Sequence, residues 1–144
     1  MTRPRTQARE AALKVLYQLD IRDDQTTDEL LASVAEEVTG QDAQDLARDL
    51  VEGTRGNLAA IDAEVEAVDH NWDLKRMAAI DRNILRLGTY ELLFREDLPA
   101  AVSINEAVQL AKKFSTKESG GFVNGILDKV HQRHPAPAAE GGSA

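Results

Sequence analysis

Apolar residues recur every three or four positions along most of this chain, and that spacing is the strongest constraint on its fold. Between about residues 5 and 19, one apolar stripe comprises Ala8, Ala11, Ala12, Val15, Leu16 and Leu19. The polar residues Arg5, Arg9 and Gln18 are predicted to lie off this stripe. No segment shows the strict apolar–polar alternation, rich in β-branched residues, that is typical of a half-buried strand. The sequence therefore predicts an all-α protein.

A capping signal follows the first helix. Thr26 and Glu29 have the spacing of a capping box, in which each residue hydrogen-bonds to the backbone of the other. This pattern predicts a short helix that runs to about Val38 and is stopped by Gly40.

The next helix is expected to be long. Asp42 can cap it, and its apolar stripe continues to Val68. This helix would contain Gly53 and Gly56, each of which costs about 1 kcal/mol relative to alanine inside a helix. We expect close packing by a neighbouring element to compensate for that cost.

Three further helices are expected in the second half of the chain. One covers about residues 77–95. The next begins between Pro99 and Ser103, and Ser103 forms a second capping-box pattern with Glu106. A polar loop over residues 115–121 precedes the last helix, which starts with Phe122.

These elements predict one domain over residues 1–134, built as a compact helical bundle. The bundle is expected to contain two small helical subdomains, at about residues 1–70 and 71–134. Trp72 lies in the connector between them and is expected to be a buried anchor. Residues 135–144 are mostly Pro, Ala and Gly, and are predicted to form a disordered tail.

Composition excludes several classes of protein. The chain has no cysteine, which excludes disulfides, thiolate metal sites and a cysteine nucleophile. Aromatic residues are too few for an RNA-binding sheet that stacks several bases. No apolar stretch approaches the roughly 20 residues of a membrane helix, and no apolar run follows the basic start as in a signal peptide. We therefore expect a soluble, cytoplasmic protein without membrane contact.

No catalytic, metal or cofactor site is predicted. His131 and His134 could share a helix face, but no third ligand is placed with them. Ser115 and Ser119 could in principle form a hydrolase triad with Asp128 and His131. Neither serine lies in a nucleophile-elbow pattern, so we predict no enzymatic activity.

Charge is distributed unevenly along the chain. The net charge is −8, but residues 20–73 hold 16 acids and only three arginines. The first 14 residues instead hold one acid and four bases, which are Arg3, Arg5, Arg9 and Lys14. Since screening acts over about 8 Å in physiological salt, RNA at the basic end would hardly feel a distant acidic face. The charge distribution permits an RNA site without requiring one.

Two features could contact phosphate. Arg5 and Arg9 lie one helical turn apart, with Arg3 extending the cluster, and arginine can donate two parallel hydrogen bonds to phosphate. Gly120 and Gly121 precede a helix whose free N–H groups can meet an anion, although the P-loop pattern is absent. The arginines could instead be only a solvated chain end. The two glycines could instead be only a helix start that packs tightly on a neighbour.

Three regions of the sequence resemble the NusB family. The first comprises residues 5–13 with Leu16-Tyr17-Gln18 and Asp20. The second comprises residues 72–77, 80–87 and 90–92. The third comprises residues 103–108, 110–114 and 118–129, including the specific run Phe122-Val123-Asn124-Gly125-Ile126-Leu127-Asp128. Together these regions cover about residues 5–130 in the family's order.

The resemblance implies an all-helical fold of two small bundles and a function in transcription antitermination. Members of the family bind the boxA element of ribosomal RNA leader transcripts, as single-stranded RNA, together with NusE, a ribosomal small-subunit protein. With other Nus factors, this complex joins elongating RNA polymerase and suppresses premature termination. Some members also form homodimers that hide the RNA surface.

The resemblance also assigns residues to two surfaces. The RNA-binding set comprises Arg3, Arg5, Arg9, Glu118, Gly120, Gly121 and Phe122. The NusE-facing set comprises Tyr17, Arg76, Asp81, Arg82 and Arg86. In the first set, glycine N–H groups would contact phosphate and the Phe122 ring would stack on a base. Thr6, Gln7 and the two glycines replace longer or more basic side chains of some relatives, so we expect weak intrinsic RNA binding that NusE reinforces.

Two other functions fit parts of the sequence. A helical protein–protein adaptor without direct RNA binding would explain the acidic middle and the few aromatics equally well. Replacing Arg5 and Arg9 with glutamate would discriminate, because only an RNA binder should lose boxA. An enzyme fragment is also conceivable, since NusB-like domains begin some RNA cytosine methyltransferases, but this chain has no strands, cofactor loop or cysteine nucleophile.

Overall fold

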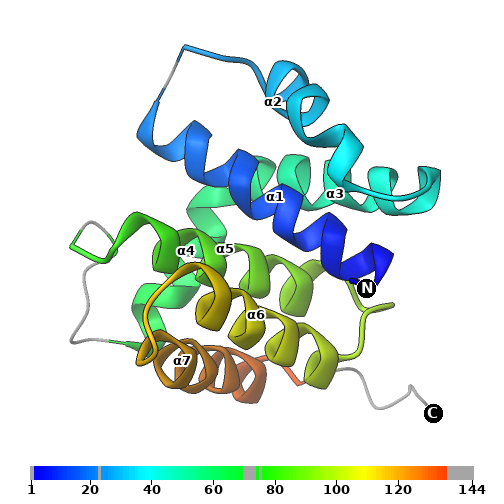
Figure 1. Cartoon of the computed structure of the whole chain (residues 1–144). Coiled ribbons are helices and arrows are strands. Elements are labelled where there is room, and N and C mark those ends of the chain that lie inside the picture. Colours follow the sequence, from blue (N-terminus) through cyan, green and yellow to red (C-terminus); the bar gives the residue numbers. More distant parts are fainter. Residues whose placement is uncertain (1, 23, 70–73, 75, 136–144) are drawn as a thin grey trace.

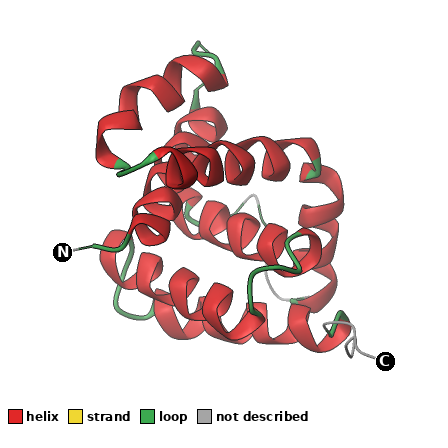
Figure 2. Cartoon of the chain, turned by 90° about the vertical axis from the view of Figure 1, so that its right-hand side faces the viewer, coloured by secondary structure: helices red, strands yellow, loops and turns green. Residues whose placement is uncertain are grey.

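The computed structural model describes residues 2–22, 24–69, 74 and 76–135. Within these residues the chain forms helices joined by loops and contains no strand, which confirms the all-α prediction (Figure 2). The elements are α1 (Pro4–Ile21), α2 (Thr27–Val34), the short 3₁₀ helix η1 (Ala35–Glu37), α3 (Gln41–Gly56), α4 (Leu58–Val68), α5 (Ala79–Phe94), α6 (Ala100–Phe114) and α7 (Ser119–Arg133). The predictions for Trp72 and for the tail beyond Pro135 lie outside the described residues.

The helix α5 is the centre of the bundle. It contacts α1, α3, α4, α6 and α7. Figure 1 shows α1, α2 and α3 on one side of it, and α6 and α7 on the other. The first half of α1 nevertheless contacts α6, through Thr6 with Glu106 and Glu10 with Lys113.

One contiguous apolar core joins all of these helices. Its fully buried side chains include Leu13, Leu50, Ile61, Ile84, Leu87 and Leu127, which come from α1, α3, α4, α5 and α7. Burying each such side chain contributes about 1.5–3 kcal/mol. The two expected subdomains thus share a core, and their division near residue 70 stays a prediction.

The predicted long helix over residues 42–68 is wrong, because the chain forms two helices there. The helix α3 ends at Gly56, and Asn57 leaves the helical region with φ −119° and ψ 23°. The Asn57 side-chain amide donates to the carbonyl oxygen of Gly53 at 2.8 Å, which satisfies an acceptor at the end of α3. The chain then turns so that α4 packs against α5 and α7.

Gly53 allows α3 to approach α5 closely. A Cβ atom at this position would overlap the ring of Tyr90. Tyr90 is buried, and its hydroxyl donates to Asp49 Oδ2 at 2.9 Å. The expected close packing against a glycine is therefore confirmed at Gly53, whereas Gly56 would meet nothing within 4 Å.

The Tyr90 phenol gives a testable pH dependence. Burial and the hydrogen bond to Asp49 raise the pKa of Tyr90 from its ordinary 10.0 to about 12. The folded state favours the neutral phenol, so this contribution to stability is complete below about pH 10 and is lost as the pH rises toward 12. The chain has two tyrosines. In an alkaline absorbance titration of the folded protein, we expect one phenolate step near pH 12 that Tyr90→Phe removes; an unchanged upper step in this variant would refute the assignment.

The capping prediction for α2 is confirmed. The Glu29 N–H donates to Thr26 Oγ1 at 3.1 Å, and the Thr26 N–H donates to Glu29 Oε1 at 2.8 Å. The helix ends earlier than predicted, at Val34, and η1 follows it. Gly40 does not stop α2. It precedes α3 with φ 92°, a left-handed conformation that favours glycine.

Two other predicted caps are wrong. Asp42 lies within the first turn of α3, after the cap position. The helix α6 begins at Ala100, within the predicted interval from Pro99 to Ser103, so Ser103 lies inside the helix and does not cap it. Proline fixes φ near −65° and needs no N–H partner, so Pro99 can start the helix without a side-chain cap. The Ser103 hydroxyl therefore does not cap the helix and instead donates to Glu91 in the core.

Two absences hold for the part of the chain that the structure describes. None of its helices is long and apolar enough to cross a membrane. Its His, Asp and Glu side chains form no group of three or more that could hold a metal ion.

Candidate nucleic-acid interface

The amino-terminal arm presents two exposed arginines. Arg3 is the extended residue before α1, and Arg5 lies in the first turn of α1. The Gln7 N–H donates to the Arg3 carbonyl oxygen at 2.9 Å, which anchors the backbone of the arm. Neither arginine forms an ion pair within the described residues, so both guanidinium groups can bind an external anion.

Arg9 does not belong to this exposed cluster, and its assignment as a phosphate contact is corrected. Its side chain is only 2% exposed. Arg9 Nε and Nη2 donate to the two carboxylate oxygens of Glu91 at 2.8 and 2.9 Å. Arg9 Nη1 donates to Glu106 at 3.4 Å. Phosphate could reach this guanidinium only by breaking the pairs that hold it in the core.

The Arg9 contacts form a polar clamp between α1, α5 and α6. Ser103 donates to Glu91 Oε1 at 2.7 Å, and Thr6 donates to Glu106 Oε1 at 2.8 Å. Burial alone would lower the pKa of Arg9, but the hydrogen bonds and charge of Glu91, together with Glu106, raise it above its ordinary value. The clamp therefore holds a charged arginine directly beneath the arm and fixes where the arm leaves the bundle.

The start of α7 forms the second part of the candidate surface. The expected loop ends at Glu118, so Gly120 and Gly121 lie in the first helical turn and not before it. Glu118 and Gly121 are exposed, and a Cβ at Gly121 would meet nothing within 4 Å. Gly120 is buried against the side chain of Lys112. Phe122 is half-buried and packs on the core.

The helix α6 connects the arm with the start of α7. Lys112 packs against Gly120, while the next residue, Lys113, pairs with Glu10 of α1 at 3.0 Å. Consecutive residues of one helix thus contact α1 and α7. The helix α6 therefore contacts both α1, which begins with the arginine arm, and the start of α7.

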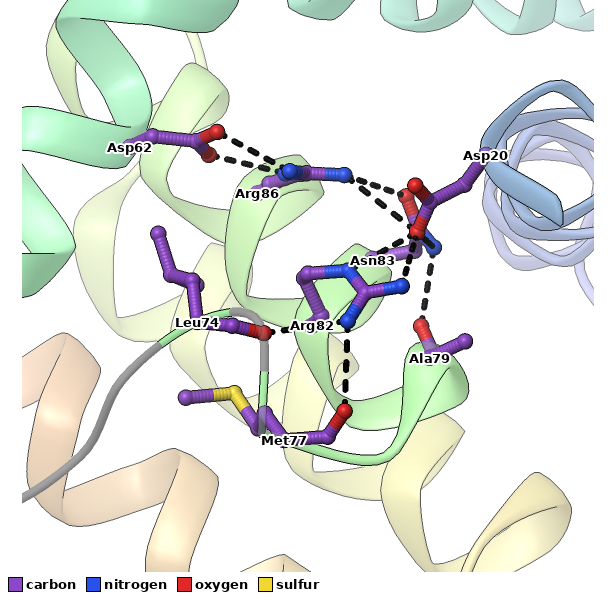
Figure 3. A network of polar contacts seen from close by, with 8 residues as sticks. All are labelled: Asp20, Asp62, Leu74, Met77, Ala79, Arg82, Asn83 and Arg86. Atoms are coloured by element: carbon purple, nitrogen blue, oxygen red, sulfur yellow. Dashed lines mark hydrogen bonds and ion pairs between the residues drawn. The ribbon is translucent and has the colours of Figure 1, made fainter.

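Arg82 and Arg86, assigned to the partner surface, are engaged inside the molecule (Figure 3). Arg82 pairs with Asp20 at 2.6 Å and donates to the carbonyl oxygens of Leu74 and Met77 at 3.0 and 3.2 Å. Both arginines are mostly buried, at 15% and 12% exposed. Their guanidinium groups therefore hold helices together within the fold, and their contact with a partner stays a prediction.

The same network joins α1, α4 and α5. Arg86 donates to both oxygens of Asp62 at 2.8 and 2.9 Å and lies 3.4 Å from Asp20 (Figure 3). Asn83 also donates to Asp20, at 2.9 Å. Burial would raise the pKa of Asp20, but the hydrogen bonds from Arg82 and Asn83 lower it below its ordinary value. Asp20 therefore stays ionised and fixes the end of α1 to α5.

The remaining residues of the partner set lie at or near the surface. Arg76 is exposed, and Tyr17 is half-buried on α1. Asp81 lies in the first turn of α5 and accepts a hydrogen bond from Ser119 at 3.1 Å. Arg76 and Tyr17 thus retain exposed surface, whereas Asp81 has one carboxylate oxygen, Oδ1, that is buried.

An open groove of about 1200 Å³ adjoins the arm on the side of α3. Its lining includes Arg3 and Arg5 together with the carboxylates Asp42 and Asp45. These acids repel phosphate. The groove itself is therefore an unfavourable site for a nucleic-acid backbone.

The chain is similar to proteins of one known class. The related proteins are transcription antitermination proteins, which are regulators and not enzymes. Residues 6–132 match the NusB family, and the chain belongs to this family. NusB of Anaeromyxobacter dehalogenans (strain 2CP-1 / ATCC BAA-258) is 47% identical over 142 residues, which are 98% of this chain and 99% of that protein.

Solved structures agree with this assignment. T. maritima NusB superimposes with a TM-score of 0.86 at 40% identity, covering 97% of this chain and 98% of that one. A NusB chain from a structure of antitermination factors NusB and NusE in complex with dsRNA gives 0.82 at 32% identity, covering 93% and 100%. The all-helical fold and the family membership are therefore established by sequence and by structure.

Proposed function

We propose that this antitermination factor binds boxA-containing RNA of ribosomal RNA leader transcripts together with NusE, and acts with other Nus factors on elongating RNA polymerase. The observation that carries the proposal is that α6 contacts both α1, whose start presents the exposed Arg3 and Arg5, and the glycine-rich start of α7. The related NusB that was solved with NusE and RNA supports the choice of both partners.

The face supplies three kinds of contact to single-stranded RNA. The planar guanidinium groups of Arg3 and Arg5 can each donate two hydrogen bonds to a phosphate. The backbone N–H groups in the first turn of α7 offer further donors to an anion. The accessible part of the Phe122 ring can stack on an unpaired base.

The salt dependence of binding tests the role of the arm. Each phosphate contact to single-stranded RNA contributes about −0.7 to the slope of log affinity against log salt. We expect the double variant Arg3→Gln/Arg5→Gln to bind boxA RNA more weakly and to reduce the slope by about 1.4. Arg22→Gln is the matched control, because Arg22 is an exposed arginine beyond the other end of α1. An equal change in both variants would contradict a local role for the arm.

Arg9 cannot be included in the charge reversal that separates an RNA binder from a protein–protein adaptor. Glutamate at Arg9 would place a second acid beside Glu91 in the core, so the loss of RNA binding could follow from unfolding. Charge reversal must therefore be confined to Arg3 and Arg5. If Arg3→Glu/Arg5→Glu keeps NusE but loses boxA RNA, the arm binds RNA; if it keeps both, the protein is an adaptor.

A further inference from the structure

A small hydroxyl cluster joins the start of α5 to the start of α7. Ser119, the first residue of α7, donates from Oγ to Asp81 Oδ2 at 3.1 Å. Its hydroxyl also lies 3.0 Å from Ser115 Oγ and 2.9 Å from Thr116 Oγ1. Ser119 is only 5% exposed, so water competes little with these contacts.

The direction of the hydrogen bonds in this cluster follows from the donor count. A serine hydroxyl has one proton, and a carboxylate can only accept. Because Ser119 donates to Asp81, it must accept from Ser115 and Thr116. The other oxygen of Asp81, Oδ1, is buried without a hydrogen-bond partner. Ser119 is therefore the principal contact that holds the Asp81 carboxylate in its present orientation.

The cluster lies between the two surfaces of the proposed function. Asp81 belongs to the partner-facing set, while Ser119 is followed directly by Gly120, Gly121 and Phe122 of the RNA-facing set. The turn over residues 115–118 is also tied to Ser119 through two hydroxyls. A chain of side-chain hydrogen bonds thus joins Asp81 to the turn that precedes the predicted RNA contacts.

We infer that Ser119 is a positioning residue that couples partner binding at Asp81 to RNA binding at the start of α7. This inference rests on the proposed function. Two binding sites are coupled when each ligand shifts the equilibrium between the same two states of the protein. Here the two states are the 115–119 turn with the Ser119–Asp81 bond formed and the same turn with this bond broken. The bond is formed in the chain alone, and a partner that contacts Asp81 would shift the equilibrium further toward this bonded state, so RNA would meet an ordered turn more often.

Removing the hydroxyl has a specific consequence. Ser119→Ala leaves Asp81 without its donor, and a buried carboxylate without one is driven to turn toward water. Ser115 and Thr116 lose their shared acceptor at the same time. The turn is then no longer linked to the partner surface, although the arginine arm is unchanged.

The test measures the affinity of the full chain for boxA RNA with and without NusE, and takes the ratio of the two affinities. We expect a ratio of about fivefold or more in the unsubstituted protein and less than about twofold in Ser119→Ala. Affinity without NusE should change little. Ser33→Ala is the matched control, because the Ser33 hydroxyl bonds only within α2.

Two further variants keep the inference falsifiable. Thr116→Val removes one donor at an exposed position and should lower the ratio partially, even if Ser119→Ala fails to fold. In an Asp81→Asn background, Ser119→Ala should have no additional effect on the ratio. A wild-type ratio in folded Ser119→Ala overturns the inference and leaves the proposed function intact. Failure of the unsubstituted chain to bind boxA RNA in either condition overturns the proposed function itself.

Discussion

Replacing Arg9 with methionine is expected to destabilise the fold by about 3–5 kcal/mol, because it leaves the buried Glu91 without its cation. Arg9 and Glu91 are each 2% exposed and share two hydrogen bonds. The remaining donor to Glu91, Ser103, cannot neutralise its charge. Urea unfolding followed by circular dichroism would measure the loss directly.

Two controls separate the clamp from the arm. Arg5→Met removes an exposed arginine one turn away and should change the unfolding free energy by less than about 0.5 kcal/mol. The double variant Arg9→Met/Glu91→Leu removes both buried charges and should recover much of the lost stability. Equal stability of Arg9→Met and the unsubstituted protein would show that the clamp does not support the fold.

Gly53→Ala is expected to destabilise the protein by about 1–3 kcal/mol, although alanine is the better helix former. The new methyl group would overlap the Tyr90 ring, which is held between α3 and α5 by the hydrogen bond to Asp49. Either the ring or the helix must shift. The thermal midpoint should fall, and the phenolate step near pH 12 should move toward pH 10 as Tyr90 is displaced.

Gly56→Ala provides the matched comparison. It lies at the end of the same helix with no neighbour within 4 Å, so alanine should be neutral or stabilising by up to about 1 kcal/mol. If the two glycine variants behaved alike, the contact with Tyr90 would not be what requires glycine at position 53.

Local sequence signals predicted the features that depend on neighbouring residues. The apolar stripe of residues 5–19 predicted α1, and the spacing of Thr26 and Glu29 predicted a cap that forms both of its bonds. The same reasoning failed at Ser103, which has an equally good capping pattern with Glu106. Pro99 starts α6 earlier, and both polar side chains then contribute to the clamp.

The role of Arg9 could not be predicted from its neighbours. Arginine is rarely buried, so the basic start of the chain indicated an exposed cluster. The partner that buries it, Glu91, is 82 residues away. One weak signal existed, since Glu91 interrupts the apolar positions of α5 next to the buried Tyr90. Arg82 and Arg86 illustrate the same limit, because Asp20 and Asp62 meet them only after α1, α4 and α5 have packed.

The direct test of the proposed function is the binding of boxA RNA and a scrambled RNA of the same composition, with and without NusE, at low salt. We predict selective binding to boxA that strengthens when NusE is added and weakens in Arg3→Gln/Arg5→Gln, while the control Arg22→Gln binds normally. Equal affinity for the two RNAs in both conditions would contradict the RNA-binding role and favour a helical adaptor.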